Sequence, residues 1–148
     1  MILMIRSFFV LPLIMVAACG GGSSAPSTAD ISAALTAAGA SNVVVVPSST
    51  WQAAIAQAQL NGVPVEGVQA EMAHIDGEVG GTFGQSIFTI QVMDSDGSAR
   101  ALARRVGKKG LPEQGSIVSK VLVNGRLVGS YVGDPRHAEV FTKTFKRL

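Results

Sequence analysis

The sequence predicts an α+β fold in which helices pack mainly on one face of an antiparallel sheet. Three observations support this fold class. Asn124-Gly125 separates two apolar stretches, a pattern typical of a type I′ hairpin turn. Polar and apolar residues alternate over Ser86–Met93, as they do in a half-buried strand. Segments with helical periodicity lie between the strands, so the predicted order is α-β-α, then β-β-α, then β-β-α.

The predicted domain begins with an amphipathic helix from about Ala29 to Ala38. Its apolar residues recur at the spacing that places them on one helical face. Ser27 and Asp30 have the spacing of a capping box, and Gly39 follows where a helix commonly ends.

A short strand and a second helix come next. Val43–Val46 is a β-branched run that ends at Pro47, which predicts a short buried strand. Whether this strand joins the main sheet stays open. The second helix is expected from about Ser49 to Gly62, with Trp51 and Ile55 on its apolar stripe. We expect Trp51 in the core, and stacking on a ligand is the alternative.

The middle of the chain predicts a strand, a connection, a second strand and a helix. Val68–Ile75 is interpreted as a strand that precedes Ser86–Met93. The connection between them, Asp76–Gln85, carries four glycines and predicts a wide hairpin loop or a mobile flap. A third helix is expected over Gly97–Val106, capped by Asp94-Ser95-Asp96.

The last part of the chain predicts a hairpin and a helix. The two strands are expected over Ile117–Val123 and Arg126–Val132, in a register that pairs Val121 with Val128. Both faces of this hairpin are apolar, so we expect it inside the sheet. Asp134-Pro135 predicts the start of the last helix. The residues expected to face inward on this helix are Ala138, Phe141, Phe145 and Leu148.

The first eighteen residues have the three parts of a secretory signal. Arg6 supplies the positive charge, Phe8–Val16 is apolar, and Ala17-Ala18 are the small residues that precede a cleavage site. The apolar run is shorter than the roughly 20 residues that a membrane-spanning helix needs. This segment is therefore expected to be removed on export.

Val16-Ala17-Ala18-Cys19 ends the signal with the only cysteine of the chain. These four residues resemble the lipobox of bacterial lipoproteins. The resemblance implies cleavage before Cys19, a diacylglyceryl group on its thiol and acylation of the new amino terminus. Gly20 in the next position implies sorting to the outer membrane in a Gram-negative cell. An ordinary signal peptide followed by a stray cysteine is the alternative.

The expected organisation has three parts. Residues 1–18 form the lipoprotein signal peptide, residues 19–28 form a lipidated cysteine and a Gly/Ser-rich tether, and residues 29–148 form one α+β domain. The domain would then lie in the cell envelope, held by Cys19 at the outer membrane and facing the periplasm. In a Gram-positive cell it would lie on the exterior of the plasma membrane.

The domain also resembles a broad group of small envelope lipoproteins of bacteria. The matching segments are Leu35–Gly39, Phe88–Ala103 and Leu127–Asp134, the last of which ends in Tyr-Val-Gly-Asp before a helix. These motifs are loose, and the resemblance implies no particular activity.

The charges are distributed unevenly along the chain. Residues 19–96 contain seven acids and no base, whereas residues 97–148 contain eleven bases and three acids. The two halves are expected either to neutralise each other within the fold or to present a basic face to an anionic partner. Such a partner would be an anionic envelope component or an envelope protein, and nucleic acid is not expected outside the cytoplasm. The candidate contacts are Arg100, Arg104, Arg105, Lys108, Lys109, Lys143, Lys146 and Arg147.

The sequence indicates a binding or scaffolding domain in preference to an enzyme. No Gly-x-Ser-x-Gly motif is present, and two histidines cannot complete a closed zinc site once the cysteine is lipidated. We therefore expect no catalytic residue, no metal and no cofactor. The alternative is a small periplasmic hydrolase or inhibitor, with a site near His74 beneath the glycine-rich segment 77–84.

Overall fold

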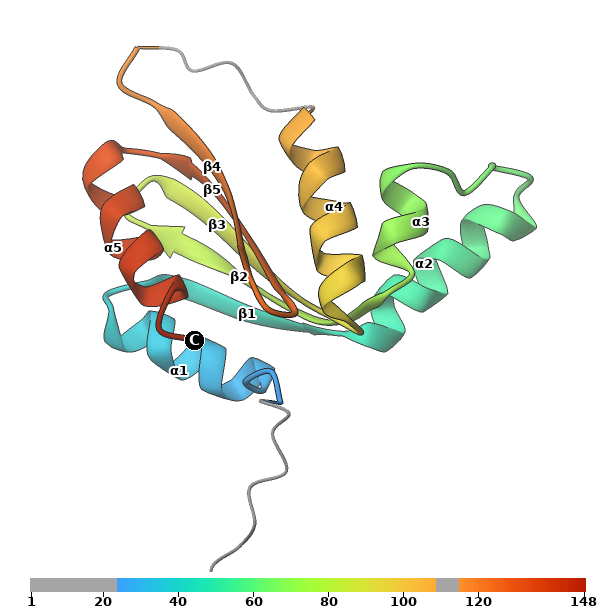
Figure 1. Ribbon diagram of the computed structural model, residues 1–148, viewed down its shortest axis with the longest axis horizontal. Helices are drawn as coiled ribbons and strands as arrows, with labels where there is room; N and C mark the ends of the chain where they lie inside the picture. Colours follow the sequence, from blue (N-terminus) through green and yellow to red (C-terminus); the bar gives the residue numbers. More distant parts are fainter. Residues whose placement is uncertain (1–23, 109–114) are drawn as a thin grey trace, which may run out of the picture.

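The computed structural model describes residues 24–108 and 115–148, so the predicted signal peptide and Cys19 lie outside the described residues. Five helices and five strands form in this part of the chain (Figure 1). The helices are α1 (Thr28–Ala37), α2 (Ser48–Leu60), α3 (Val68–Met72), α4 (Asp96–Lys108) and α5 (Pro135–Phe145). The strands are β1 (Ser41–Pro47), β2 (Ile75–Phe83), β3 (Ser86–Met93), β4 (Val118–Asn124) and β5 (Leu127–Gly133). Among the described residues, no helix has the length and apolar character needed to cross a membrane.

The predicted fold class is confirmed. The five strands form one antiparallel sheet in the order β1-β2-β3-β5-β4. The strand at residues 43–46 therefore joins the main sheet, as edge strand β1. Only its burial was predicted wrongly, because Val44 is 59% exposed at this edge and only Val43 packs against the larger core.

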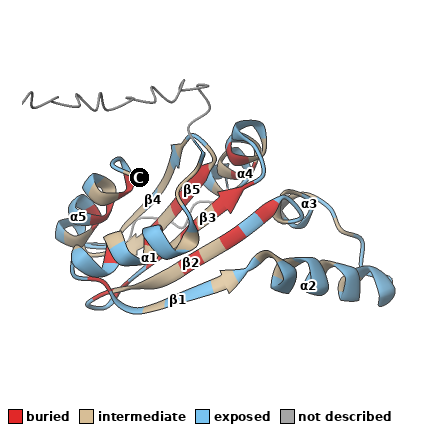
Figure 2. Ribbon diagram, turned by 90° about the horizontal axis from the view of Figure 1, so that it is seen from below, coloured by how far each residue is buried: buried red, intermediate tan, exposed pale blue. Residues whose placement is uncertain are grey.

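Two core clusters lie on opposite faces of the sheet. The larger cluster joins α1 and α5 to the sheet through residues such as Leu35, Phe141 and Leu127. The smaller cluster joins α4 to the sheet through Val128. Val128 follows Leu127 in β5, and adjacent residues of a strand point to opposite faces of the sheet. Figure 2 shows buried residues recurring along the central strands. The helices thus lie on both faces: α1 and α5 pack on the larger cluster, and α4, with Trp51 of α2 and Met72 of α3, packs on the smaller one.

Both predicted helix caps at the ends of the domain are confirmed. Asp30 donates its backbone N–H to the Ser27 side chain, and the Asp30 carboxylate accepts from the Ser27 backbone N–H. Asp134 caps α5 by accepting from the Arg136 backbone N–H, with Pro135 at the first helical position. These caps fix where the chain enters the first helix and where it leaves the last strand.

The region between the second helix and β3 was predicted wrongly. Residues 68–72 form the short helix α3, and the glycine-rich segment assigned to a loop or flap forms β2. Its glycines permit close contacts within the fold. A side-chain carbon at Gly81 would lie 2.7 Å from the Phe88 ring, and one at Gly77 would lie 2.8 Å from the Thr28 side chain. At these two positions neighbouring groups occupy the space that a side chain would need.

The hairpin at Asn124-Gly125 forms, but its register differs from the prediction. Val121 pairs with Ser130 and Val123 pairs with Val128, so Gly125 and Arg126 make the two-residue turn. Gly125, the first turn residue, has a positive φ of 54°, whereas Arg126, the second, does not have a positive φ. This combination is typical of a type II′ turn. The hairpin is not wholly inside the sheet, because β4 is an edge strand.

A set of stacked aromatic rings holds α5 on the sheet. Phe141 lies between the rings of Phe88 and Tyr131, with ring centroids 5.7 and 5.5 Å away. Phe145 extends the set toward Gly129, where an added side-chain carbon would lie 2.7 Å from its ring. The absence of a side chain at Gly129 therefore lets α5 approach β5 closely.

This close approach can be tested by substitution. Gly129→Ala is expected to lower the free energy of unfolding by about 1–3 kcal/mol, because the new methyl group overlaps Phe145. Gly107→Ala is the matched control: it lies in α4 with no neighbouring atom within 4 Å, and is expected to stabilise the chain by up to about 1 kcal/mol. Urea denaturation measures both effects. Equal stability of Gly129→Ala and the wild type would contradict this packing.

Candidate functional site

The predicted basic residues fall into two groups on opposite faces of the sheet. Arg100, Arg104, Arg105 and Lys108 belong to α4, which packs on the smaller core cluster. Lys143 lies on α5, with Lys146 and Arg147 just after its end, and α5 packs on the larger cluster. Figure 1 shows α4 and α5 on either side of the strands. The seven described candidates therefore do not share one face, and Lys109 lies outside the described residues.

Three of the four α4 bases line a hollow between α3 and α4, which we call the α3–α4 hollow. It has a volume of about 330 Å³. Its lining residues are Glu71, Ala101, Arg104, Arg105 and Lys108. The Arg105 Nε donates to the Glu71 carboxylate over 3.1 Å, whereas Arg104 and Lys108 make no ion pair with any described residue. Three cationic groups thus line one concave surface with a single carboxylate.

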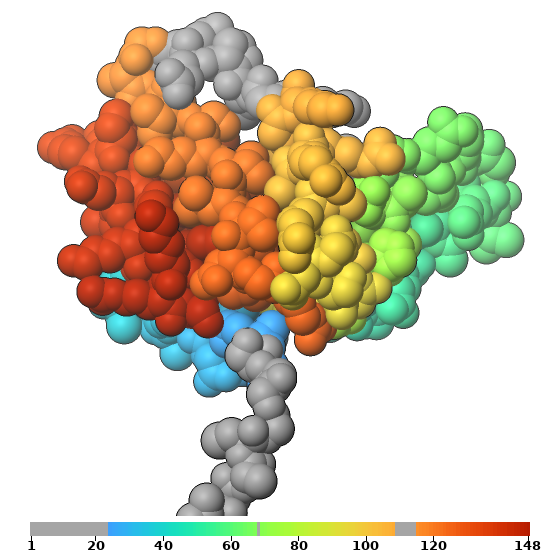
Figure 3. Space-filling view, in the orientation of Figure 1, coloured from blue at the N-terminus to red at the C-terminus, as the bar shows by residue number. Residues whose placement is uncertain are grey.

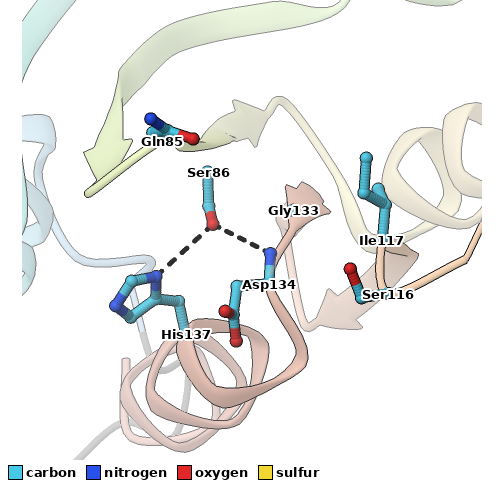
Figure 4. Close-up of a pocket in the computed structure, with 7 residues that line it drawn as sticks. All are labelled: Gln85, Ser86, Ser116, Ile117, Gly133, Asp134 and His137. Atoms are coloured by element: carbon cyan, nitrogen blue, oxygen red, sulfur yellow. Dashed lines mark hydrogen bonds between the residues drawn. The ribbon is translucent and has the colours of Figure 1, made fainter.

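A second cavity lies where β3, β5 and the start of α5 meet, and we call it the Ser86 cavity. It has a volume of about 440 Å³. Its lining residues are Gln85, Ser86, Ser116, Ile117, Gly133, Asp134 and His137 (Figure 4). Five of these seven residues are polar or charged, so the cavity has a mainly polar lining.

Ser86 is 2% exposed and lies between two partners. Its hydroxyl oxygen accepts from the Asp134 backbone N–H over 3.0 Å and is 3.5 Å from His137 Nδ1 (Figure 4). Gly133 makes this contact possible, because a side-chain carbon there would lie 2.2 Å from the hydroxyl oxygen. Ser86 therefore fixes the corner at which β5 turns into α5.

The carboxylate of Asp134 is not directed to His137 as it would be in a catalytic triad. It accepts from the Arg136 side chain over 3.0 and 3.2 Å and from the Arg136 backbone N–H over 2.8 Å. These bonds lower the pKa of Asp134 from 3.8 to about 2. The His137 ring instead stacks on Phe83, with centroids 6.3 Å apart. The polar groups of the cavity mainly hold the β5–α5 corner.

The His74 region differs from the site considered for a hydrolase. The histidine is exposed, and its Nδ1 lies 2.7 Å from the Asp94 carboxylate. This hydrogen bond, after that from Ser98, lowers the pKa of Asp94. Segment 77–84 is mostly strand β2, so it is not a flap over His74. Within residues 24–108 and 115–148, no group of three or more His, Cys, Asp or Glu side chains is placed to hold a metal ion.

Sequence reasoning missed the Ser86 cavity because its residues are far apart in the chain. Ser86 and His137 are separated by 51 residues and belong to no recognisable motif. Only the pairing of β3 with β5, in which Ile87 lies opposite Val132, brings Ser86 beside Gly133. Comparison with protein-family models, curated proteins and solved structures gives no match to this chain.

The structural role of Ser86 can be tested by removing its hydroxyl group. Ser86→Ala leaves the Asp134 N–H without its acceptor and is expected to cost about 1–3 kcal/mol of unfolding free energy. Ser116→Ala, in the same cavity but exposed, is expected to change stability by less than about 0.5 kcal/mol. Urea denaturation compares them. A serine-directed fluorophosphonate that labels the wild type but not Ser86→Ala would contradict a purely structural role.

The Asp134 cap predicts a stability change at acid pH. Its pKa is lower in the folded chain, so its ionised form contributes stability that is complete above the ordinary value of 3.8. This contribution is lost as the pH falls through about 2. Asp134→Asn keeps a capping side chain without the charge, so its deficit in melting temperature should shrink over that range. Arg136→Gln should lose the larger share of this pH-dependent part, which comes from the side-chain hydrogen bonds, and keep the share from the backbone N–H. A deficit independent of pH would contradict this origin.

Proposed function

We propose that this protein is a cell-envelope lipoprotein, anchored through Cys19, whose α+β domain binds or scaffolds without catalysing a reaction. The observation that carries the proposal is Val16-Ala17-Ala18-Cys19, directly after the apolar run. A thiolate forms a thioether readily, and two or more acyl chains hold a protein firmly on a bilayer. The Gly residue after Cys19 favours the outer membrane.

The position of the first helix supports a short tether. The capping box of α1 at Ser27 lies only eight residues after Cys19. A fully extended chain of eight residues spans at most about 29 Å. The domain would therefore stay close to the membrane surface.

Two features of the domain support binding over catalysis. In the Ser86 cavity, the hydroxyl of Ser86 and the carboxylate of Asp134 already serve the backbone corner and the helix cap. In the α3–α4 hollow, Arg104 and Lys108 extend from a rigid helix toward a concave surface. The first arrangement holds the fold together, whereas the second presents charge to a ligand.

The anchor is tested by metabolic labelling with a palmitate analogue. Wild-type protein should be labelled and recovered with membranes, and Cys19→Ser should lose both properties because the acceptor thiol is gone. The double variant Cys19→Ser/Ser23→Cys keeps one cysteine but moves it out of the lipobox context, and it should also remain unlabelled. Labelling of Cys19→Ser at the wild-type level would overturn the proposal.

A further inference from the structure

We propose that the α3–α4 hollow binds a phosphate-bearing anionic group. The chemistry of the hollow stands on its own contacts, and only the source of the ligand, a component of the cell envelope, rests on the proposed function. Three bases and one carboxylate line this hollow. Because Glu71 pairs with Arg105, the hollow has a net positive charge from the other two bases. A phosphate monoester carries about −1.5 to −2 charges at neutral pH, which matches the two remaining bases.

Arg105 is held in place by contacts with the α3 region. Its Nε donates to Glu71 Oε1 over 3.1 Å, and its Nη1 lies 3.8 Å from the position of a side-chain carbon built at Gly67. The Glu71 side chain is only 16% exposed, so solvent has little access to the carboxylate of this ion pair. A guanidinium that is already oriented loses less conformational freedom when its other N–H groups bind an anion.

Arg104 and Lys108 complete the hollow from the same helix face. They are four residues apart, the spacing that places two side chains one above the other on a helix. Ala101, one turn earlier, also lines the hollow and leaves room because its side chain is small. Phosphate oxygens can therefore meet an Arg fork and a Lys ammonium together, which are the groups that bind phosphate most strongly.

The volume of the hollow fits more than a bare ion. About 330 Å³ is at the lower end of the range for small-molecule sites, roughly 300–1,000 Å³. One phosphate with part of the sugar or glycerol that carries it would fill such a space. The ligand class is thus a phosphorylated headgroup or the phosphate of an envelope polymer.

The hollow lies away from the point where the tether enters. The start of α4 lies beside the β4–β5 turn, since Asp96 is 3.9 Å from the side-chain position of Gly125. Lys108 is twelve residues further along, or about 18 Å at 1.5 Å per residue. Figure 1 shows the entry to α1 and the C-terminus at one end of the molecule and the last turn of α4 at the other. In the space-filling view α4 lies between the strands and α3 (Figure 3).

The test uses the full chain in neutral detergent and isothermal titration calorimetry with inorganic pyrophosphate at low salt. Arg104→Gln/Lys108→Gln should weaken binding at least about tenfold, because two charge-assisted contacts are lost. The matched control Lys143→Gln/Lys146→Gln removes the same charge from the opposite face and should change binding less than about twofold. Melting temperatures confirm that both variants fold.

Further arms identify the source and separate the two proposals. Citrate tests whether any multivalent anion suffices, and flotation with vesicles that contain phosphatidic acid, whose headgroup is a phosphate monoester, tests lipid headgroups. Hollow-dependent binding to either phosphate probe supports the site and names its source. Equal loss in both double variants, equal binding of citrate, or binding to neither phosphate probe would overturn it. The Cys19→Ser chain should bind pyrophosphate like the wild type, so failure of the anchor and failure of the hollow are distinguishable.

Discussion

The architecture depends on the contact between α5 and the sheet at two glycines of β5. Gly129 admits the ring of Phe145, and Gly133 admits the side chain of Ser86. Because these positions carry no side chain, the aromatic rings of α5 stack within van der Waals reach of the central strands. Asp134 then caps the helix directly after the second glycine. The missing side chain at Gly129 lets α5 approach the sheet, and the hydrogen bonds of the Asp134 cap fix where the helix begins.

Ion pairs within the fold neutralise part of the opposite charges of the two halves of the chain. Glu71 and Asp76 come from the acidic half, and each pairs with an arginine of the basic half, Arg105 and Arg126 respectively. The Arg126 side chain also donates to the Met93 carbonyl, so this pair fastens the hairpin turn to the ends of β2 and β3. The two halves therefore neutralise part of each other's charge, while the remaining bases are separated by the sheet.

The features that could be predicted from sequence are those with a local cause. Strand β3 has the predicted bounds, and the caps at Ser27 and Asp134 follow from side chains within three residues of each helix start. The strand β2 was missed because its glycines are explained by contacts that exist only in the folded chain, of Gly77 with Thr28 and of Gly81 with Phe88 on the next strand. The hairpin register was missed because Gly125 can be either the first or the second residue of a two-residue turn. The local sequence therefore allows both Asn124-Gly125 and Gly125-Arg126, and the folded chain has the second.

The candidate sites were predictable to different degrees for the same reason. The bases of α4 were visible as a helical pattern, yet their division from those of α5 required knowing which face of the sheet each helix covers. The Ser86 cavity joins segments 51 residues apart, and only the strand order brings them together.

Helix α2 contains no buried residue, although Trp51 packs partly against the smaller core cluster, and Leu60 at its end is 82% exposed. Its backbone hydrogen bonds are thus protected by little apolar contact, and an isolated 13-residue helix of this kind is marginal in water. The amide protons of α2 should exchange with solvent through local opening, while those of β3 and β5 wait for opening of the whole domain. On this expectation the sheet would exchange slowly, and α2 would open locally while the rest of the domain stays folded.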